Sequence, residues 1–269
     1  MEVQRADAVC SLVLLQGRGI PVECVIDVGA AEGSFFLIRH EAGLFPRARH
    51  FFVDAMDENR PLYERIAAAF PAEHAIAAAA NFDGETDLQV DPGAYNTHVR
   101  GLQPEAPRYA SRRVAVRTLD GLCAERGLGG PYLVKVDVQG GELDVLRGAC
   151  KVLEGASIVV LEAQICLFRD TLPDLMEFMR TRDFVLYDLT NLSYYQSDHT
   201  LYQCLAVFIA RRFDFRRQEP YPSASAEATE RERLAARQKY IRDRIEQTCA
   251  VRAGPVHATL PDGAGFSLR

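Results

Sequence analysis

The sequence predicts an α/β protein with a mostly parallel sheet, helices on both faces and one reversed strand near an edge. Apolar β-rich runs alternate with amphipathic segments for most of the 269 residues, and such repeats build parallel sheets. The last two apolar runs, residues 184–190 and 201–211, are joined by about ten residues without a helical pattern. Because a parallel crossover needs a longer connection, these two strands should pair antiparallel.

The first half of the chain is predicted to hold two strand–helix units followed by less regular segments. Helices are expected over residues 5–17, 33–43 and 59–70, and strands over residues 23–29, 50–56, 74–82 and 86–91. Residues 74–82 fit either a helix or a strand by composition, and their position between a helix and a turn favours a strand. Residues 92–112 are rich in Gly, Pro and polar residues and are predicted as a long loop.

The second half continues the alternation. Strands are expected over residues 113–120, 132–138, 156–164, 184–190 and 201–211, and helices over residues 119–127, 140–153 and 172–181. Thr118 or Asp120 is expected to cap the first of these helices, and Gly148 to end or bend the second.

The composition changes after Phe215, which divides the chain into a domain over residues 1–215 and an extension over residues 216–269. The extension begins with a Pro/Ser/Ala linker and continues as a charged helix over residues 229–250. Its narrow apolar seam suits a solvated surface helix, a lid over the site or the contact of a homodimer.

Composition limits the class of protein. With 48% hydrophobic residues the chain can bury a sizeable core, yet no apolar run approaches the ~20 residues of a membrane span. The N-terminus lacks the pattern of a secretory signal, so we expect a soluble, cytoplasmic protein with no membrane partner. A net charge of −6 argues against nucleic acid as a partner. The seven cysteines form no CxxC pair, which disfavours a zinc site or a disulfide framework.

The segment VECVIDVGAAEGSF, residues 22–35, reads as a strand that breaks into a glycine loop at the start of a helix. Gly29 and Gly33 would let the backbone approach a ligand, which the free N–H groups of the helix could also meet. An ordinary turn between a strand and a helix explains the same residues equally well.

A second acid narrows the choice of ligand. Asp54 ends the next strand, about twenty residues after Gly33, where a carboxylate can accept hydrogen bonds from both hydroxyls of a ribose. Capping of a helix near Asp57 is the alternative. The loop lacks the GxG that accommodates a pyrophosphate, which favours S-adenosyl-L-methionine over NAD. Asp27 or Glu32 could then neutralise the ammonium of that cofactor.

A third motif is VKVDVQGGELDVLRGA, residues 134–149, in which Asp137 ends a buried strand and Gly140 and Gly141 open a turn. An acid at this place could serve as a general base, a metal ligand, a substrate anchor or a helix cap.

Taken in order, the motifs VIDVGAAEGSF, FFVDAMDEN, VRTLDGLCAERG and YLVKVDVQGGELDVLRGA resemble the FkbM-type S-adenosylmethionine-dependent methyltransferases over about residues 22–211. The resemblance implies a class I (Rossmann-like) methyltransferase fold, with a seven-stranded sheet whose last strand is antiparallel. Family members are mostly O-methyltransferases acting on sugars, polyketides and other natural-product hydroxyls.

The resemblance also implies roles for single residues. Asp27, Gly29, Ala30 and Gly33 would line the methionine end of S-adenosyl-L-methionine, and Asp54, followed by Ala55, would hold the ribose. Residues 79–82, with Ala80 and Asn81 among them, would flank the adenine, and Asp137 would face the methyl group. The family commonly has Glu-Pro at Asp54–Ala55 and Asn at Ala31, so this chain has a shorter acid and lacks one amide.

A hydroxyl acceptor must lose a proton during methyl transfer, which calls for a base or a metal. Asp137 is the first candidate base. Glu162 and Gln164 end the next strand, and Asp137 with Glu162 would suit Mg²⁺, although Glu162 could merely hydrogen-bond. His98 and His199 lie in predicted loops, and His199 is a second catalytic candidate.

The sequence thus predicts an S-adenosyl-L-methionine-dependent methyltransferase of a small-molecule hydroxyl. Two alternatives stay open at this point. One is an NAD-dependent oxidoreductase, and the other is a non-catalytic cofactor-binding module of the same fold.

Overall fold

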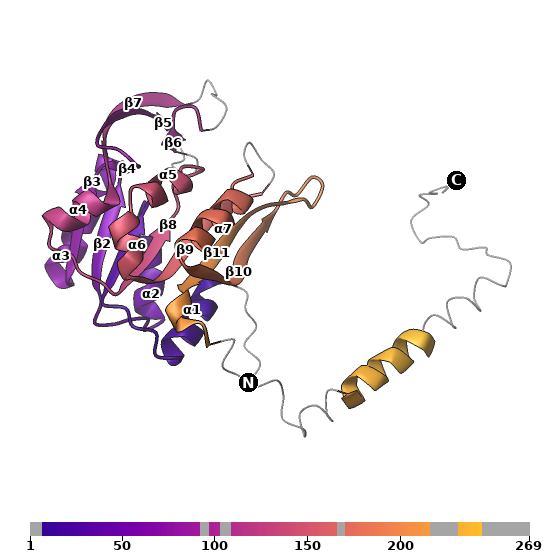
Figure 1. The fold of residues 1–269 in the computed structure, drawn as a ribbon. Helices are drawn as coiled ribbons and strands as arrows, with labels where there is room; N and C mark the ends of the chain where they lie inside the picture. The colour runs from indigo at the N-terminus through magenta and orange to yellow at the C-terminus, as the bar shows by residue number, and fades with distance from the viewer. Residues whose placement is uncertain (1–6, 92–96, 103–108, 166–169, 216–230, 244–269) are drawn as a thin grey trace. The chain divides into compact units, whose positions relative to one another are not determined.

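A computed structural model describes residues 7–91, 97–102, 109–165, 170–215 and 231–243. The chain divides into two compact units, Met1–Asp214 and Phe215–Arg269. In the second unit, residues 231–243 form a helix within the predicted span of 229–250, and the rest of that span lies outside the described residues. The fold below is that of the first unit (Figure 1).

The larger sheet orders its seven described strands as β10-β11-β9-β8-β1-β2-β3. Their bounds are β1 Cys24–Val28, β2 Arg49–Asp54, β3 Ala72–Ile76, β8 Tyr132–Val136, β9 Ala156–Gln164, β10 Phe184–Tyr194 and β11 Leu201–Ala210. β11 runs antiparallel to both β9 and β10, whereas the other pairs are parallel. The predicted sheet with one reversed strand next to an edge is therefore confirmed.

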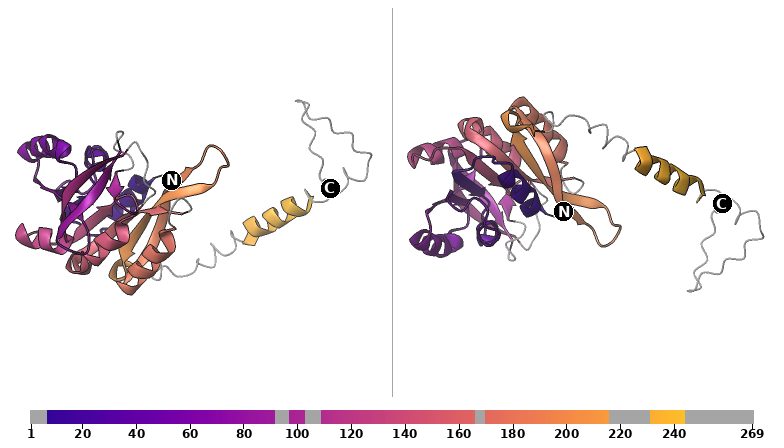
Figure 2. Two further views of the ribbon diagram at one scale, coloured as in Figure 1. Left: turned by 90° about the horizontal axis from the view of Figure 1, so that it is seen from above. Right: turned by 90° about the horizontal axis from the view of Figure 1, so that it is seen from below.

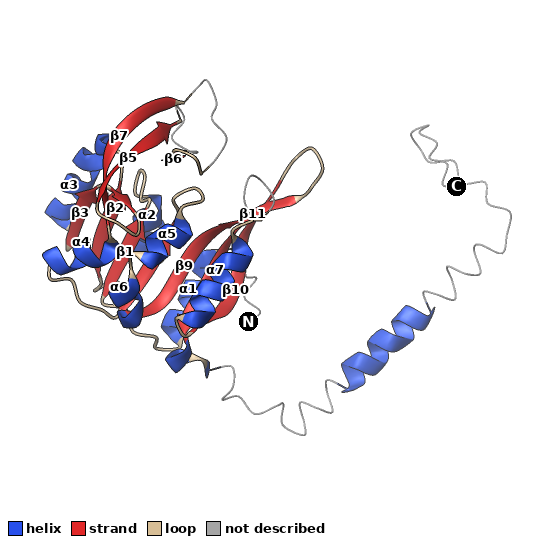
Figure 3. Ribbon diagram, turned by 45° about the horizontal axis from the view of Figure 1, so that its top comes forward, coloured by secondary structure: helices blue, strands red, loops and turns tan. Residues whose placement is uncertain are grey.

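Helices cover both faces of this sheet (Figures 2 and 3). They are α1 Ala8–Gly17, α2 Ser34–Glu41, α3 Arg60–Ala69, α4 Leu119–Glu125, α5 Glu142–Arg147, α6 Cys150–Gly155 and α7 Leu172–Thr181, with short 3-10 turns η1 Asp57–Asn59 and η2 Arg211–Phe213. Residues of α4, α5, α6 and α7 share one core cluster with the strands, whereas Phe36 of α2 and Tyr63 of α3 pack against Phe52 in a separate cluster. Every residue of β1, β8 and β9 is buried, as expected for strands covered on both faces.

A second, smaller sheet has the strand order β4-β7-β5-β6. It comprises β4 Ala78–Ala79, β5 Gly84–Val90, β6 His98–Val99 and β7 Ala110–Arg117. The predicted strand over 74–82 is divided between β3 and β4, which belong to different sheets. The predicted loop over 92–112 is wrong at β6 and at the start of β7, while residues 92–96 and 103–108 lie outside the described residues.

The predicted helix over residues 140–153 is two helices, α5 and α6, separated at Gly148 as its glycine suggested. A Cβ atom at Gly148 would lie 2.0 Å from the carbonyl oxygen of Ala80, so only glycine lets these two backbone segments approach. No helix in the described part of the chain is both long and apolar enough to cross a bilayer.

Candidate functional site

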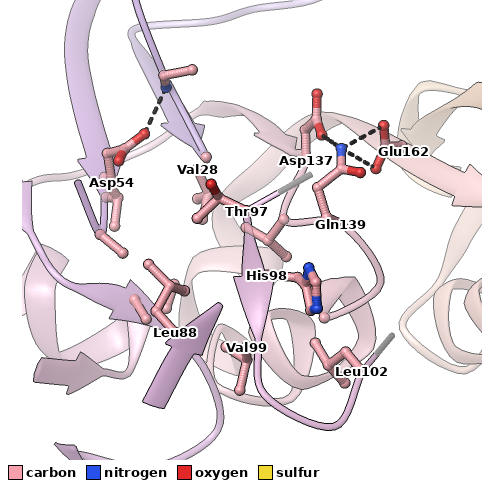
Figure 4. Close-up of a pocket in the computed structure, with 18 of the residues that line it drawn as sticks. Val28, Asp54, Leu88, Thr97, His98, Val99, Leu102, Asp137, Gln139 and Glu162 are labelled. Carbon is pink, nitrogen blue, oxygen red and sulfur yellow. Dashed lines mark hydrogen bonds between the residues drawn. The ribbon is translucent and has the colours of Figure 1, made fainter. Parts of the chain in front are cut away.

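A cavity of about 970 Å³ lies where β1, β2, β8 and β9 end (Figure 4). The chain leaves β1 toward β2 on one side and returns to β8 on the other, so the cavity marks the point where strand order reverses. Ligands of open α/β sheets bind at such a point. Thr86 and Leu88 of β5 and His98 and Val99 of β6 line the side formed by the smaller sheet.

The glycine loop after β1 forms one wall of the cavity. Gly29 has a φ of +70°, and a Cβ atom there would lie 1.8 Å from the backbone oxygen of Asp137. The loop is therefore seated directly against the end of β8, which only glycine allows at this position. Ala31 also adopts a left-handed conformation, with a φ of 45°, and its carbonyl accepts a hydrogen bond from the Tyr63 hydroxyl at 2.5 Å.

Asp54 joins this loop to the end of β2. Its Oδ2 accepts a hydrogen bond from the Ala31 N–H at 2.6 Å, and its Oδ1 accepts one from the Met56 N–H at 2.7 Å. Burial raises the pKa of Asp54, although both N–H groups act to lower it. Each carboxylate oxygen can accept a second hydrogen bond, and Asp54 lines the cavity, as the ribose-binding prediction requires.

Asp27 does not line the cavity, contrary to the prediction for the methionine end of the cofactor. Its side chain is fully buried within the sheet, where Lys135 Nζ lies 3.3 Å from Oδ1 and His50 Nε2 lies 3.7 Å from Oδ2. Burial acts to raise the pKa of Asp27, but the charge of Lys135 and the interaction with His50 hold it below its ordinary value. Asp27 thus faces a cation of the protein rather than the cavity.

Lys135 of β8 is a site residue that the sequence interpretation missed. Its ammonium donates to the Gly29 carbonyl at 2.9 Å and lies 3.5 Å from Asp137 Oδ2. Burial acts to lower the pKa of Lys135, and the carboxylates of Asp27 and Asp137 outweigh it, so the pKa is raised and the side chain is charged.

Asp137 and Glu162 lie in the cavity together, as predicted, and an amide joins them (Figure 4). Gln139 Nε2 donates to Asp137 Oδ1 at 3.0 Å and to the two oxygens of Glu162 at 3.0 and 3.1 Å. Gln203 Nε2 also donates to Glu162. Burial, followed by the charge of Asp137, raises the pKa of Glu162 well above its ordinary value. The Asp137 side chain is 31% exposed and is the more accessible acid of the two.

The predicted Mg²⁺ site gains no support. Among the described residues, no group of three or more His, Cys, Asp or Glu side chains is arranged to hold a metal ion. The space between Asp137 and Glu162 is taken by the Gln139 amide, a hydrogen-bond donor, whereas a hard cation needs oxygen ligands turned toward it.

Of the other predicted site residues, some line the cavity and some do not. Gly29, Ala30, Glu32, Ala55, Ala80, His98 and Gln164 line the cavity, in agreement with their predicted placement. Gly33 and Asn81 do not. A Cβ atom at Gly33 would meet Ile66 and Phe52 on the helix side, and Asn81 is exposed, with Phe82 beyond it lining the cavity instead.

His199, the second catalytic candidate, does not reach the cavity. It is exposed in the connection between β10 and β11, its φ is 58°, and it does not line the cavity. Tyr195 of the predicted acceptor segment 191–199 does line it and contacts the ring of Tyr202 with centroids 4.5 Å apart.

The sheet order, the reversed β11 and the glycine loop at the end of β1 define a class I methyltransferase fold. The family profile of the methyltransferase FkbM domain matches residues 27–186, and the chain belongs to this family. No curated protein sequence matches the chain.

Solved structures similar to this chain are methyltransferases of low sequence identity. The FkbM methyltransferase of Methylobacillus flagellatus KT is 16% identical, with a TM-score of 0.44 over 68% of this chain and 43% of that one. The 1,6-didemethyltoxoflavin-N1-methyltransferase of Burkholderia thailandensis, solved with bound 1,6-didemethyltoxoflavin and S-adenosylhomocysteine, is 14% identical over 74% of this chain and 76% of that one, with a TM-score of 0.40. Fibrillarin of Aeropyrum pernix, with bound S-adenosyl-L-methionine, is 10% identical over 73% of each chain, with a TM-score of 0.39.

Proposed function

We propose that this protein uses S-adenosyl-L-methionine to methylate a hydroxyl group of a small molecule. The observation that carries the proposal is one cavity with two chemically distinct ends. The Gly29 loop and Asp54 form the first end, which suits a nucleoside, and Asp137 with Gln139 and Glu162 forms the second, which suits a hydroxyl. Family membership supplies the reaction class.

The first end fits the cofactor. Asp54 offers carboxylate oxygens to the ribose hydroxyls, the loop from Gly29 to Ala31 offers backbone groups to the methionine end, and Ala80 and Phe82 offer apolar surface to the adenine. When bound, the sulfonium supplies a methyl group that is already activated for displacement. The protein chiefly has to hold an acceptor oxygen in line with the C–S bond, which is catalysis by positioning.

The second end supplies the base. Asp137 is the exposed acid of the cavity, and Lys135 and Gln139 hold one carboxylate oxygen each. In the proposed reaction Asp137 accepts the proton of the acceptor hydroxyl as the oxygen bonds to the methyl carbon. Because burial and Asp137 favour its protonated form, Glu162 is assigned to acceptor binding through Gln139 rather than to proton removal.

Cofactor binding tests the proposal first. Calorimetry with S-adenosylhomocysteine should show micromolar affinity for the wild type and at least tenfold weaker binding for Asp54→Ala. Asp57→Ala is the matched control, because this neighbouring acid is exposed and pairs only with Arg60 among the described residues. Wild-type protein without affinity for S-adenosylhomocysteine would refute the assignment.

Transfer chemistry is tested second. Incubation with radiolabelled S-adenosyl-L-methionine and a set of hydroxylated sugars and polyketides should label at least one oxygen, with turnover at least a hundredfold lower in Asp137→Asn. Cofactor binding without labelling of any acceptor would favour the non-catalytic module. The NAD-dependent oxidoreductase has no observation in its favour.

We also propose that the partner of the protein is a small-molecule acceptor. The net charge of −6 supports a small-molecule acceptor rather than nucleic acid. A homodimer formed through the C-terminal helix and a cytoplasmic location stay predictions.

A further inference from the structure

We propose that Lys135 is a positioning residue, whose ammonium is held from behind by Asp27 and fixes the Gly29 carbonyl and the Asp137 carboxylate in one arrangement. The inference deepens the proposed function and rests on it, since it assigns the residue that joins the cofactor loop to the base. Nothing in the family match assigns this role.

The position of Lys135 follows from strand register. Asp27 of β1 and Lys135 of β8 are register partners in neighbouring parallel strands, so their side chains leave the sheet on the same face. Asp137 follows two residues after Lys135 and, with side chains alternating along the strand, extends toward that face as well. The ammonium therefore lies between two carboxylates, 3.3 Å from Asp27 Oδ1 and 3.5 Å from Asp137 Oδ2.

Asp27 depends on Lys135 for charge compensation. Neither Asp27 oxygen accepts a hydrogen bond of normal geometry from the described residues, and burial lowers the pKa of His50, which leaves that imidazole neutral near pH 7. An unpaired buried carboxylate is costly, so the pair holds the ammonium in place. Asp27 is thus the anchor of Lys135, which explains an acid at the end of β1 that does not reach the cavity.

The other contacts of Lys135 are at the reacting end of the cavity. It donates to the Gly29 carbonyl at 2.9 Å, and Gly29 begins the loop that would hold the methionine end of the cofactor. On Asp137, Lys135 faces Oδ2 while Gln139 Nε2 donates to Oδ1, so both oxygens of the proposed base are oriented. A lysine that merely neutralised Asp27 would need neither contact.

The test separates positioning from charge compensation. Lys135→Met alone leaves Asp27 unpaired and is expected to destabilise the fold, so the informative variant is Asp27→Asn/Lys135→Met, which removes both charges. We expect this double variant to unfold within a few degrees of the wild type. Its dissociation constant for S-adenosylhomocysteine should rise at least tenfold, and kcat should fall at least tenfold with the acceptor found above.

Two further variants complete the design. Asp27→Asn weakens the anchor but keeps Lys135 and its contacts with Gly29 and Asp137, so its affinity should fall by about threefold, clearly less than in the double variant. Lys151→Met removes an exposed lysine of α6 and should change nothing. Wild-type affinity and turnover in the double variant, or equal losses in Asp27→Asn and the double variant, would overturn the inference. Failure of the wild type itself to bind S-adenosylhomocysteine would instead overturn the proposed function.

Discussion

Among the described glycines, Gly29 leaves the least room for an added side chain. Its backbone is left-handed, and a single added carbon would lie 1.8 Å from the Asp137 carbonyl oxygen. The loop after β1 and the end of β8 are in contact at this residue, and both line the cavity. Any adjustment that relieves such a clash must move one of them.

Gly29→Ala should therefore abolish measurable binding of S-adenosylhomocysteine and lower the free energy of unfolding by about 3 kcal/mol, from a strained φ and an overpacked contact. Calorimetry and chemical denaturation measure the two effects. Gly43→Ala is the matched control, since Gly43 has a φ of +63° with nothing within 4 Å of the added carbon. It should cost about 1 kcal/mol and leave binding intact. Equal effects of the two substitutions would refute the steric explanation.

At the scale of single residues, the sequence predicted which acids lie near the site better than it predicted the contacts of each side chain. Asp54 and Asp137 end strands and reach the cavity. Asp27 lies in β1, in which both faces are buried, and alternation cannot distinguish the faces of a strand whose every residue is buried. Lys135 was not predicted as a site residue, because its contacts depend on the pairing of two strands that are more than a hundred residues apart in the chain.

At the scale of elements, Asp120 connects two helices. Thr118 is the N-cap of α4, whereas Asp120, the other predicted cap, accepts hydrogen bonds from the N–H groups of Lys151 and Val152 at the start of α6. The carboxylate at the start of a helix also meets the positive end of its dipole. Asp120, which belongs to α4, thus accepts hydrogen bonds from free N–H groups in the first turn of α6.

Asp120→Ala should lower the free energy of unfolding by about 1–2 kcal/mol, the usual cost of losing a cap. Chemical denaturation measures the loss, and Asp174→Ala provides the control, because Asp174 is an exposed acid in the first turn of α7. The affinity for S-adenosylhomocysteine should stay unchanged in both variants. A loss below 0.5 kcal/mol, the usual range for a surface substitution, would show that Asp120 does not stabilise α6.

Elements with strong periodicity were predicted well, and those set by tertiary contacts were not. The helix over 172–181 and the strand over 156–164 match α7 and β9. In the smaller sheet, β5 and β7 were expected as strands over residues 86–91 and 113–120. β6 fell in the predicted loop, and the separate sheet was not predicted, because its strand pairing joins segments distant in the chain. Gly148 was expected to end or bend the helix, and it separates α5 from α6, but the approach of Ala80 that requires a glycine there was not visible in any local pattern.

At the scale of the whole molecule, acidic groups buried near the site make stability depend on pH. Glu142 accepts hydrogen bonds from the N–H groups of Val138 and Gly140 through Oε1, and its Oε2 has no hydrogen-bond partner among the described residues. Burial, opposed by these N–H groups, raises the pKa of Glu142 to about 7. The folded protein thus binds a proton that the unfolded chain, with a pKa of about 4.5, has released.

This contribution to stability is complete below pH 4.5 and is lost as the pH rises through 7. Glu142→Gln removes the titration, so its unfolding free energy relative to the wild type should rise by roughly 2–3 kcal/mol between pH 5 and pH 8. Denaturation curves at several pH values measure the change. A difference that stays flat with pH would contradict the shifted pKa.

The topology was predictable because it depends on connection lengths, which the sequence displays. The short link between residues 190 and 201 required an antiparallel pair, and β10 and β11 form one. The shape of the cavity was not predictable, since its lining comes from both sheets and from segments distant in the chain. Ordered motifs identified the family, and the geometry of contacts then assigned the partners of each residue.

The contact between Lys135 and the Gly29 carbonyl also has a consequence for the order of folding. The two residues are 106 positions apart, so their contact forms only once β1 and β8 have paired across this long separation. The binding site is therefore complete only when these two strands have paired. A ligand that binds only the finished site stabilises it by mass action, by about 2.7 kcal/mol at a hundredfold excess over the dissociation constant. If the protein binds S-adenosyl-L-methionine as proposed, a supply of this cofactor would raise the fraction of the protein that is folded.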